Sequence, residues 1–65
     1  MQLEVKYDVF RKRVICKDTE SGIIGKMVMA TSEDEAYRIM SSIDLDEVAE
    51  HVKEIKAYNG KENKK

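Results

Sequence analysis

Apolar and charged residues alternate at the start of the chain. The apolar positions are Leu3, Val5, Tyr7 and Val9, with a charged residue between each pair. This period of two predicts a β-strand with one buried face. Phe10 breaks the alternation and the basic run 11–13 follows, so the chain either turns at about residues 11–12 or passes through a bulge that leaves one long bent strand. Although no Gly, Asn or Asp occupies the positions that a tight hairpin prefers, we expect the turn, and therefore three strands before residue 31.

The next two strands are joined by a clearer turn. Val14–Cys16 is an apolar, β-branched stretch, and the polar run 18–22 ends in Gly22, which is typical of a type I turn closed by a residue with positive φ. The third strand is expected over residues 23–30. We expect Ile24, Val28 and Ala30 on its inward face and Ile23, Met27 and Met29 on its outward face. A shift of one residue would exchange the two sets.

Two helices are expected after the strands. Ser32 and Glu35 form a capping box, and Asp44 with Glu47 repeats this spacing. Apolar residues follow each box at helical intervals: Ala36, Ile39, Met40 and Ile43 after the first, and Leu45, Val48, Ala49, Val52 and Ile55 after the second. Asn59–Gly60 is expected to end the second helix. The alternative is a fourth strand over residues 54–58, which the spacing of residues 45–55 fits less well.

The pattern as a whole predicts an α+β fold, in which a three-stranded antiparallel sheet is followed by two helices packed on one face (β-β-β-α-α). We expect residues 1–60 to form one small domain and residues 61–65 to form a disordered charged tail. A chain of 65 residues buries too little surface to be more than marginally stable alone. Either self-association as a homodimer or partner binding is therefore expected.

Candidate catalytic groups are few. Cys16 and His51 are the single cysteine and histidine, so neither a disulfide nor an ordinary zinc site can be assembled. We expect Cys16 to be a buried structural thiol and His51 a solvated helix residue. The acidic residues at both helix starts are accounted for by the helix dipole, and neither an EF-hand nor a phosphate-binding glycine loop is present. We expect no enzymatic activity, no cofactor and no metal.

Charge distribution suggests how the chain recognises its partner. The net charge is −1, yet the first half is mildly basic and the second half acidic, which argues against nonspecific nucleic-acid binding through the whole surface. Three candidate surfaces result: the basic residues Arg11, Lys12 and Arg13, the outward residues Ile23, Met27 and Met29, and the acidic residues Asp46, Glu47, Glu50 and Glu54.

We therefore expect a protein-binding module, namely an adaptor, regulator or inhibitor that acts on a larger protein through its acidic helix surface or its exposed sheet face. The alternative is a small nucleic-acid-binding protein that uses the basic strand residues. The N-terminus lacks the apolar run of a signal peptide or membrane span, so a cytoplasmic location without membrane contact is expected. A small chain rich in Lys and Glu would suit a bacterial or phage regulatory protein.

Overall fold

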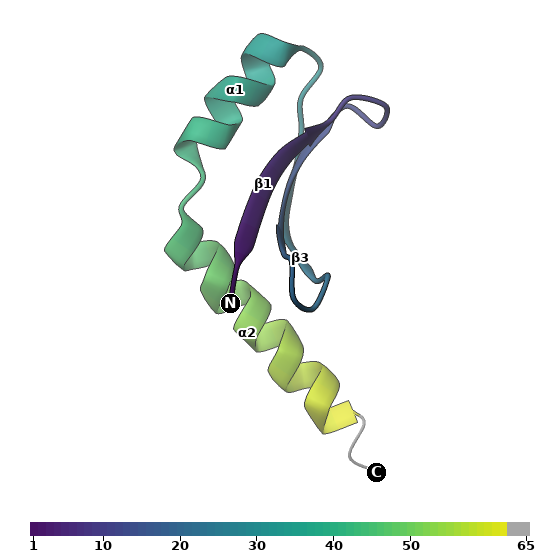
Figure 1. Ribbon diagram of the computed structural model, residues 1–65, viewed down its shortest axis with the longest axis vertical. Coiled ribbons are helices and arrows are strands. Elements are labelled where there is room, and N and C mark those ends of the chain that lie inside the picture. The colour runs from purple at the N-terminus through teal and green to yellow at the C-terminus, as the bar shows by residue number, and fades with distance from the viewer. Residues whose placement is uncertain (63–65) are drawn as a thin grey trace.

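A three-stranded antiparallel sheet forms one layer of the protein and two helices form the other (Figure 1). The computed structural model describes the backbone of residues 1–62 and the side chains of residues 1–59. The elements, in chain order, are β1 (Leu3–Asp8), β2 (Arg13–Asp18), β3 (Ile24–Met29), α1 (Glu33–Ser42) and α2 (Leu45–Glu62). The strand order is β1-β2-β3. The predicted β-β-β-α-α fold is confirmed.

The loop between β1 and β2 is a turn, as expected, and it begins earlier than the alternation suggested. Asp8 pairs with Arg13, so residues 9–12 form a four-residue connection. Val9 lies in this connection and is 64% exposed, which makes its placement on the buried face of the strand wrong. The Asp8 carboxylate accepts a hydrogen bond from the Arg11 N–H at 3.3 Å, and Lys12 takes the left-handed conformation, with φ of 52°. An aspartate at the first position favours such a turn.

The hairpin between β2 and β3 has the expected glycine. Gly22 has a φ of 79°, and its N–H donates to the Asp18 carbonyl at 2.7 Å. The pairing register then shifts, because Cys16 pairs with Lys26 whereas Lys17 pairs with Ile24. Gly25 is the extra residue, so β3 carries a bulge.

The bulge corrects the predicted faces of the third strand. Ile23 packs against the core residues Cys16, Val48 and Val52, while Ile24 is exposed. The expectation that Ile23 faces outward and Ile24 inward is therefore wrong, because one extra residue exchanges the faces on its two sides. Beyond the bulge the prediction is confirmed: Met27 and Met29 are exposed on the outward face, and Ala30 is buried.

The core consists of two adjoining clusters between the sheet and the helices. Val14, Ala30 and Ala36 form the cluster beneath α1, and Cys16, Val48 and Val52 form the cluster beneath α2. Gly25 allows α2 to approach β3 closely, since a Cβ atom there would lie 2.8 Å from a methyl carbon of Val48 and 2.8 Å from one of Val52. The helical stripes predicted from the sequence supply half of these six buried residues, namely Ala36, Val48 and Val52.

Both helices begin at their predicted caps. The Ser32 hydroxyl accepts a hydrogen bond from the Glu35 N–H at 3.2 Å, and the Glu35 carboxylate accepts one from the Thr31 N–H at 2.7 Å. The Asp44 carboxylate accepts from the N–H groups of Asp46 and Glu47.

The end of α2 differs from the prediction. The helix includes residues 54–58, which excludes the alternative fourth strand, and it continues through Asn59 and Gly60 to Glu62. The expected stop at Asn59–Gly60 is wrong because a glycine ends a helix when it takes the left-handed conformation, whereas Gly60 continues the helix. The predicted tail of residues 61–65 therefore begins inside α2, and residues 63–65 lie outside the described residues.

Candidate interaction surface

The face of the sheet opposite the helices forms an exposed, mixed apolar and basic surface, which we call the outer face. Because Val14 and Cys16 point into the core, the alternate residues of β2 point away from it. Each of these faces an apolar residue of β3 across the sheet: Arg13 pairs with Met29, Ile15 with Met27, and Lys17 with Ile24. Cations on the central strand therefore flank apolar side chains on the edge strand.

The structure joins two of the three surfaces predicted from the sequence. Arg13 belongs to the basic run 11–13, and its Nη1 donates to the sulfur of Met27 at 3.1 Å. Met27 and Met29 are 52% and 66% exposed. Ile23, the third member of the predicted apolar set, is not part of this surface, because it packs in the core. The basic run and the methionines therefore form one continuous surface.

Asp8 organises the cations at the hairpin end of the outer face. One of its oxygens, Oδ2, lies 3.2 Å from Arg11 Nη1 and 3.6 Å from Arg13 Nε. The hydrogen bond from the Arg11 N–H, together with the charges of both arginines, lowers the pKa of Asp8. Arg13 Nε is buried and has no hydrogen-bond partner in the described part of the chain. At the tip of the hairpin, Phe10 is 97% exposed.

Ile15 lies at the centre of the outer face and is nevertheless only 6% exposed. Its neighbours across the sheet are Lys6 on β1 and Met27 on β3, and their long side chains cover it. A shallow hollow of about 510 Å³ lies between the centre of the outer face and the β1–β2 hairpin. The hollow is lined by Lys6, Tyr7, Asp8, Val9, Phe10, Arg11, Arg13 and Ile15.

The acidic surface predicted on the second helix lies in the other layer of the molecule. Asp46, Glu47, Glu50 and Glu54 are all exposed on α2. Three of these carboxylates lie near positive or ionisable groups of the same chain. Glu47 is 4.0 Å from Lys26, Glu50 is 3.7 Å from Lys53, and Glu54 is 3.7 Å from His51. The acidic surface is therefore separate from the outer face and is partly neutralised.

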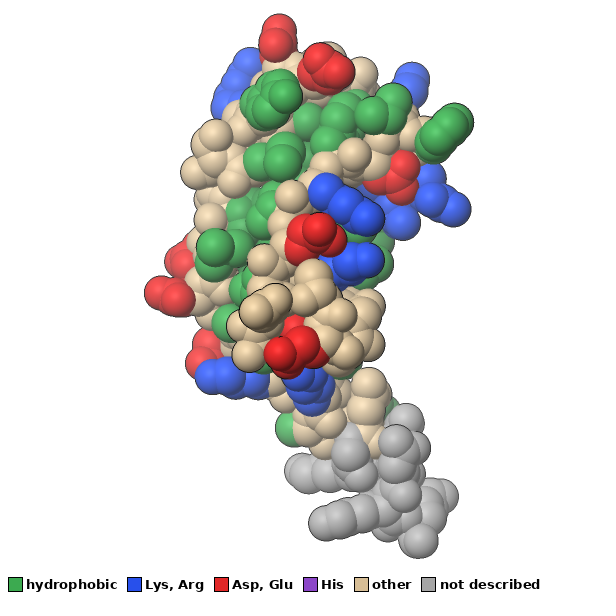
Figure 2. Space-filling view, in the orientation of Figure 1, with side chains coloured by type: hydrophobic (Ala, Val, Ile, Leu, Met, Phe, Trp, Pro, Cys, Tyr) green, Lys and Arg blue, Asp and Glu red, His purple; other side chains and the backbone are tan. Residues whose placement is uncertain are grey.

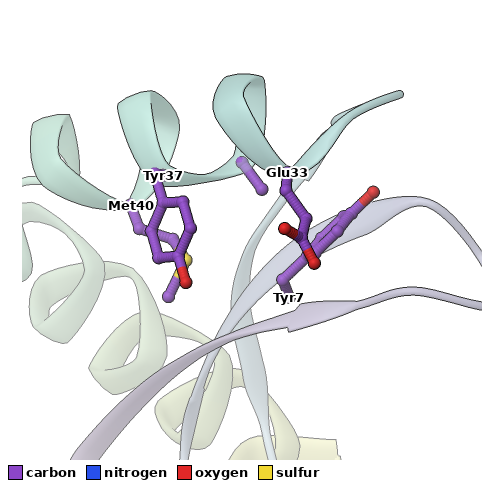
Figure 3. Close-up of a pocket in the computed structure, with 5 residues that line it drawn as sticks. Tyr7, Glu33, Tyr37 and Met40 are labelled. Atoms are coloured by element: carbon purple, nitrogen blue, oxygen red, sulfur yellow. The ribbon is translucent and has the colours of Figure 1, made fainter.

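A groove between β1 and α1 lies on the helix side of the sheet, and the sequence did not indicate it. Its volume is about 120 Å³, and it is lined by Tyr7, Glu33, Ala36, Tyr37 and Met40. Figure 3 shows Glu33, Tyr37 and Met40 extending from α1 toward the strand that carries Tyr7. The Tyr7 hydroxyl donates to the Ala30 carbonyl at 3.0 Å. In Figure 2 hydrophobic side chains form a band along this seam.

Asp18 forms a buried polar site that the sequence also did not reveal. Its side chain is completely buried, yet it accepts hydrogen bonds from the Ser21 hydroxyl at 2.8 Å and from the N–H groups of Gln2 and Glu20. Lys56 Nζ lies 3.0 Å away. The Ser21 hydroxyl and the Lys56 ammonium hold the pKa of Asp18 far below its ordinary value. The site therefore ties the N-terminus, the β2–β3 turn and α2 together.

The single cysteine and histidine occupy the environments expected from the sequence. Cys16 is fully buried, and this burial raises the pKa of its thiol, which disfavours the reactive thiolate. The His51 side chain is 56% exposed beside Glu54. Within the described residues no group of three or more His, Cys, Asp or Glu side chains is placed to hold a metal ion. Neither helix, as far as it is described, is long and apolar enough to cross a membrane.

Comparison with known protein families, with curated proteins and with solved structures found no match to this chain.

Proposed function

We propose that this chain is a non-enzymatic protein-binding module, an adaptor, regulator or inhibitor, that binds a larger protein through its outer face. The observation that carries the proposal is the row of exposed apolar side chains on β3, Ile24, Met27 and Met29, beside Arg13 and Lys17 on β2. Exposed apolar groups rimmed by charges mark protein interfaces. The hairpin tip extends this surface with the fully exposed Phe10.

The composition of the outer face favours a partner surface that is acidic at its rim and apolar at its centre. The outer face and its hairpin carry more cations than carboxylates: Lys6, Arg11, Arg13 and Lys17 against Glu4 and Asp8. This surplus of positive charge steers a partner of opposite charge. Methionine side chains adapt to irregular apolar surfaces, and an aromatic anchor such as Phe10 is typical of interface residues that carry binding energy.

The outer face supports this proposal better than the acidic surface of α2 does. Three of the four predicted acidic residues already lie near cations or His51 of the same chain. Such exposed ion pairs contribute little energy. Variants of the α2 surface therefore serve as the control.

Nucleic-acid binding is the second candidate, because Phe10 is 97% exposed between basic side chains and offers a stacking face for a base. Two observations weigh against it. Asp8 lies against both Arg11 and Arg13, and Glu4 adds another negative charge to the outward side of β1. A phosphate backbone would be repelled by these carboxylates.

The test compares two sets of variants in affinity capture from the source cell, followed by titration with the purified partner. Met27→Ser combined with Met29→Ser, and separately Phe10→Ala, remove the apolar groups of the outer face. Each is expected to weaken binding by about tenfold or more. Glu50→Gln combined with Glu54→Gln is the control on α2 and is expected to bind like the unchanged chain.

Equal binding by all variants, or loss of binding only in the α2 variant, would contradict the proposal. A stoichiometric nucleic acid in place of a protein, with affinity that falls steeply as salt is added, would replace it with the second candidate.

A further inference from the structure

We propose that the chain forms a symmetric homodimer through the free edge of β1, with the two copies of β1 paired antiparallel about Val5. The proposal concerns a different surface from the outer face and goes beyond the proposed function. β1 is an edge strand of the sheet, and among residues 1–62 no other segment passes in front of it in Figure 1. An uncovered edge strand is a template for pairing with another strand.

The backbone groups that face this free edge follow from the register. The Thr19 N–H donates to the Gln2 carbonyl, so Gln2 and Thr19 form a hydrogen-bonded pair of the β1–β2 ladder. Such pairs alternate along antiparallel strands. The backbone groups of Glu4 and Lys6 therefore point toward β2, and those of Leu3, Val5 and Tyr7 point toward the open edge. Pairing about Val5 joins these three outward residues of one copy to the same three of the other.

The charges of β1 select this register. With Val5 opposite Val5 of the second copy, Glu4 lies directly opposite Lys6 of the second copy, and Lys6 lies opposite its Glu4. Opposite charges at such positions stabilise a strand pair, and like charges destabilise it. Moving the two-fold axis by one residue places Glu4 against Glu4 or Lys6 against Lys6. The outward side of β1 is thus complementary to itself in one register.

The apolar residues of β1 agree with the same register. Leu3, Val5 and Tyr7 lie on the side of the strand that packs against the core clusters. Pairing about Val5 sets Leu3 of each copy opposite Tyr7 of the other. Tyr7 lines the groove of about 120 Å³ between β1 and α1, so the Leu3 side chain of the second copy lies beside that groove. Apolar surface at the seam (Figure 2) would be covered in this arrangement.

The opposite edge of the sheet is less suited to pairing. β3 is interrupted by the bulge at Gly25, and bulges at sheet edges discourage the addition of a strand. α2 packs beside β3, so pairing of two β3 edges would bring the acidic helices of the two copies toward each other. The pairing of β1 with β2, in contrast, is regular from Leu3 to Asp8.

The test measures mass by sedimentation from micromolar to millimolar concentration. The unchanged chain is expected to approach twice its mass of 7.5 kDa.

Glu4→Lys and Lys6→Glu, each alone, place like charges opposite one another and are expected to raise the dissociation constant by at least about tenfold. An equimolar mixture of the two variants restores opposite charges in both pairs, and is expected to form a heterodimer as tight as the original homodimer. Glu4→Lys combined with Lys6→Glu in one chain is expected to restore the homodimer.

Both substituted side chains are exposed, so circular dichroism should show an unchanged fold. A matched pair on the other edge, Met27→Lys and Met29→Lys, is expected to leave the dimer intact. The proposal is overturned if the unchanged chain stays monomeric at millimolar concentration or if the mixture associates no better than either variant alone. It is also overturned if the β3 variants abolish association while the β1 variants do not. None of these measurements depends on a partner protein, so failure here is distinct from failure of the proposed function.

Discussion

At the scale of single residues, Asp18 is the side chain on which the most distant parts of the chain converge. It is fully buried and contacts groups from the N-terminus, the β2–β3 turn and α2. Because hydrogen bonds from Ser21 and Lys56 depress its pKa in the folded protein, folding favours the ionised form. Its contribution to stability is therefore present above the pKa of the unfolded state, about 4, and is lost as the pH falls below that value.

We expect Asp18→Asn to lower the melting temperature clearly at neutral pH, because the substitution leaves Lys56 without its charged partner. The difference from the unchanged chain should shrink as the pH falls below about 4. Thermal unfolding followed by circular dichroism between pH 7 and pH 2 measures both effects. Asp34→Asn, at an exposed site in α1, is the control. A difference between Asp18→Asn and the unchanged chain that did not change with pH would contradict the account.

Gly25 sets the distance between β3 and α2. A Cβ atom at this position would lie 2.8 Å from methyl carbons of Val48 and Val52, so Gly25→Ala should destabilise the fold by about 1–3 kcal/mol through overpacking. Urea unfolding gives the change in free energy. In combination with Val48→Ala, which removes one of the two methyl groups in the way, the cost of Gly25→Ala should fall. Strict additivity of the two substitutions would show that the close approach is not limiting.

At the scale of secondary-structure elements, the features that the sequence predicted are those decided by neighbouring residues. The positive φ of Gly22 and the Ser32 cap each depend on a few consecutive side chains. The bulge, in contrast, places Gly25 against Val48 and Val52 of α2, and Asp18 is paired with Lys56. Both contacts join residues far apart in sequence. Gly25 inside the predicted strand was the one local sign of the bulge, and because the prediction did not include the bulge, the faces of Ile23 and Ile24 were predicted incorrectly.

The same distinction applies to the candidate surfaces. The prediction that Met27 and Met29 face outward is correct because the strand alternates regularly beyond the bulge. The union of these methionines with Arg13 requires the β2–β3 register, and a single sequence does not fix a register. The groove between β1 and α1 depends on how the helix lies relative to the strand. The spacing of apolar residues along the sequence does not predict that arrangement.

The start of α1 provides a test at this scale. The Ser32 hydroxyl accepts from the Glu35 N–H, so Ser32→Ala should cost about 1 kcal/mol of unfolding free energy. The control is Ser41→Ala near the end of the same helix. Its hydroxyl donates to the Tyr37 carbonyl, an interaction that adds little to helix stability, and the expected change is within about 0.5 kcal/mol. Urea unfolding distinguishes the two, and equal costs would show that the cap is not what stabilises the start of α1.

At the scale of the whole molecule, the sheet presents three distinct environments. The side toward the helices holds the core clusters, the outer face carries exposed apolar and basic groups, and the β1 edge offers free backbone groups. A small domain gains stability by covering surface that its own chain leaves open. Pairing at β1 and binding at the outer face use different surfaces, so a dimer would present two outer faces to its partners.

Hydrogen exchange of individual backbone amides tests this arrangement. Because alternate amides of β1 point toward β2 and toward the open edge, the exchange rates along β1 should alternate from one residue to the next. In dilute solution the amides of Glu4 and Lys6, which point toward β2, should exchange at least about tenfold more slowly than those of Val5 and Tyr7, which point outward. At concentrations that favour the dimer, Val5 and Tyr7 should become protected, while Met27 on the β3 edge should remain unprotected. NMR exchange at two protein concentrations measures all six amides when Met29 is included. Strong protection of Val5 in dilute solution would mean that the β1 edge is already covered within the monomer, and fast exchange of Val5 at every concentration would mean that β1 does not pair.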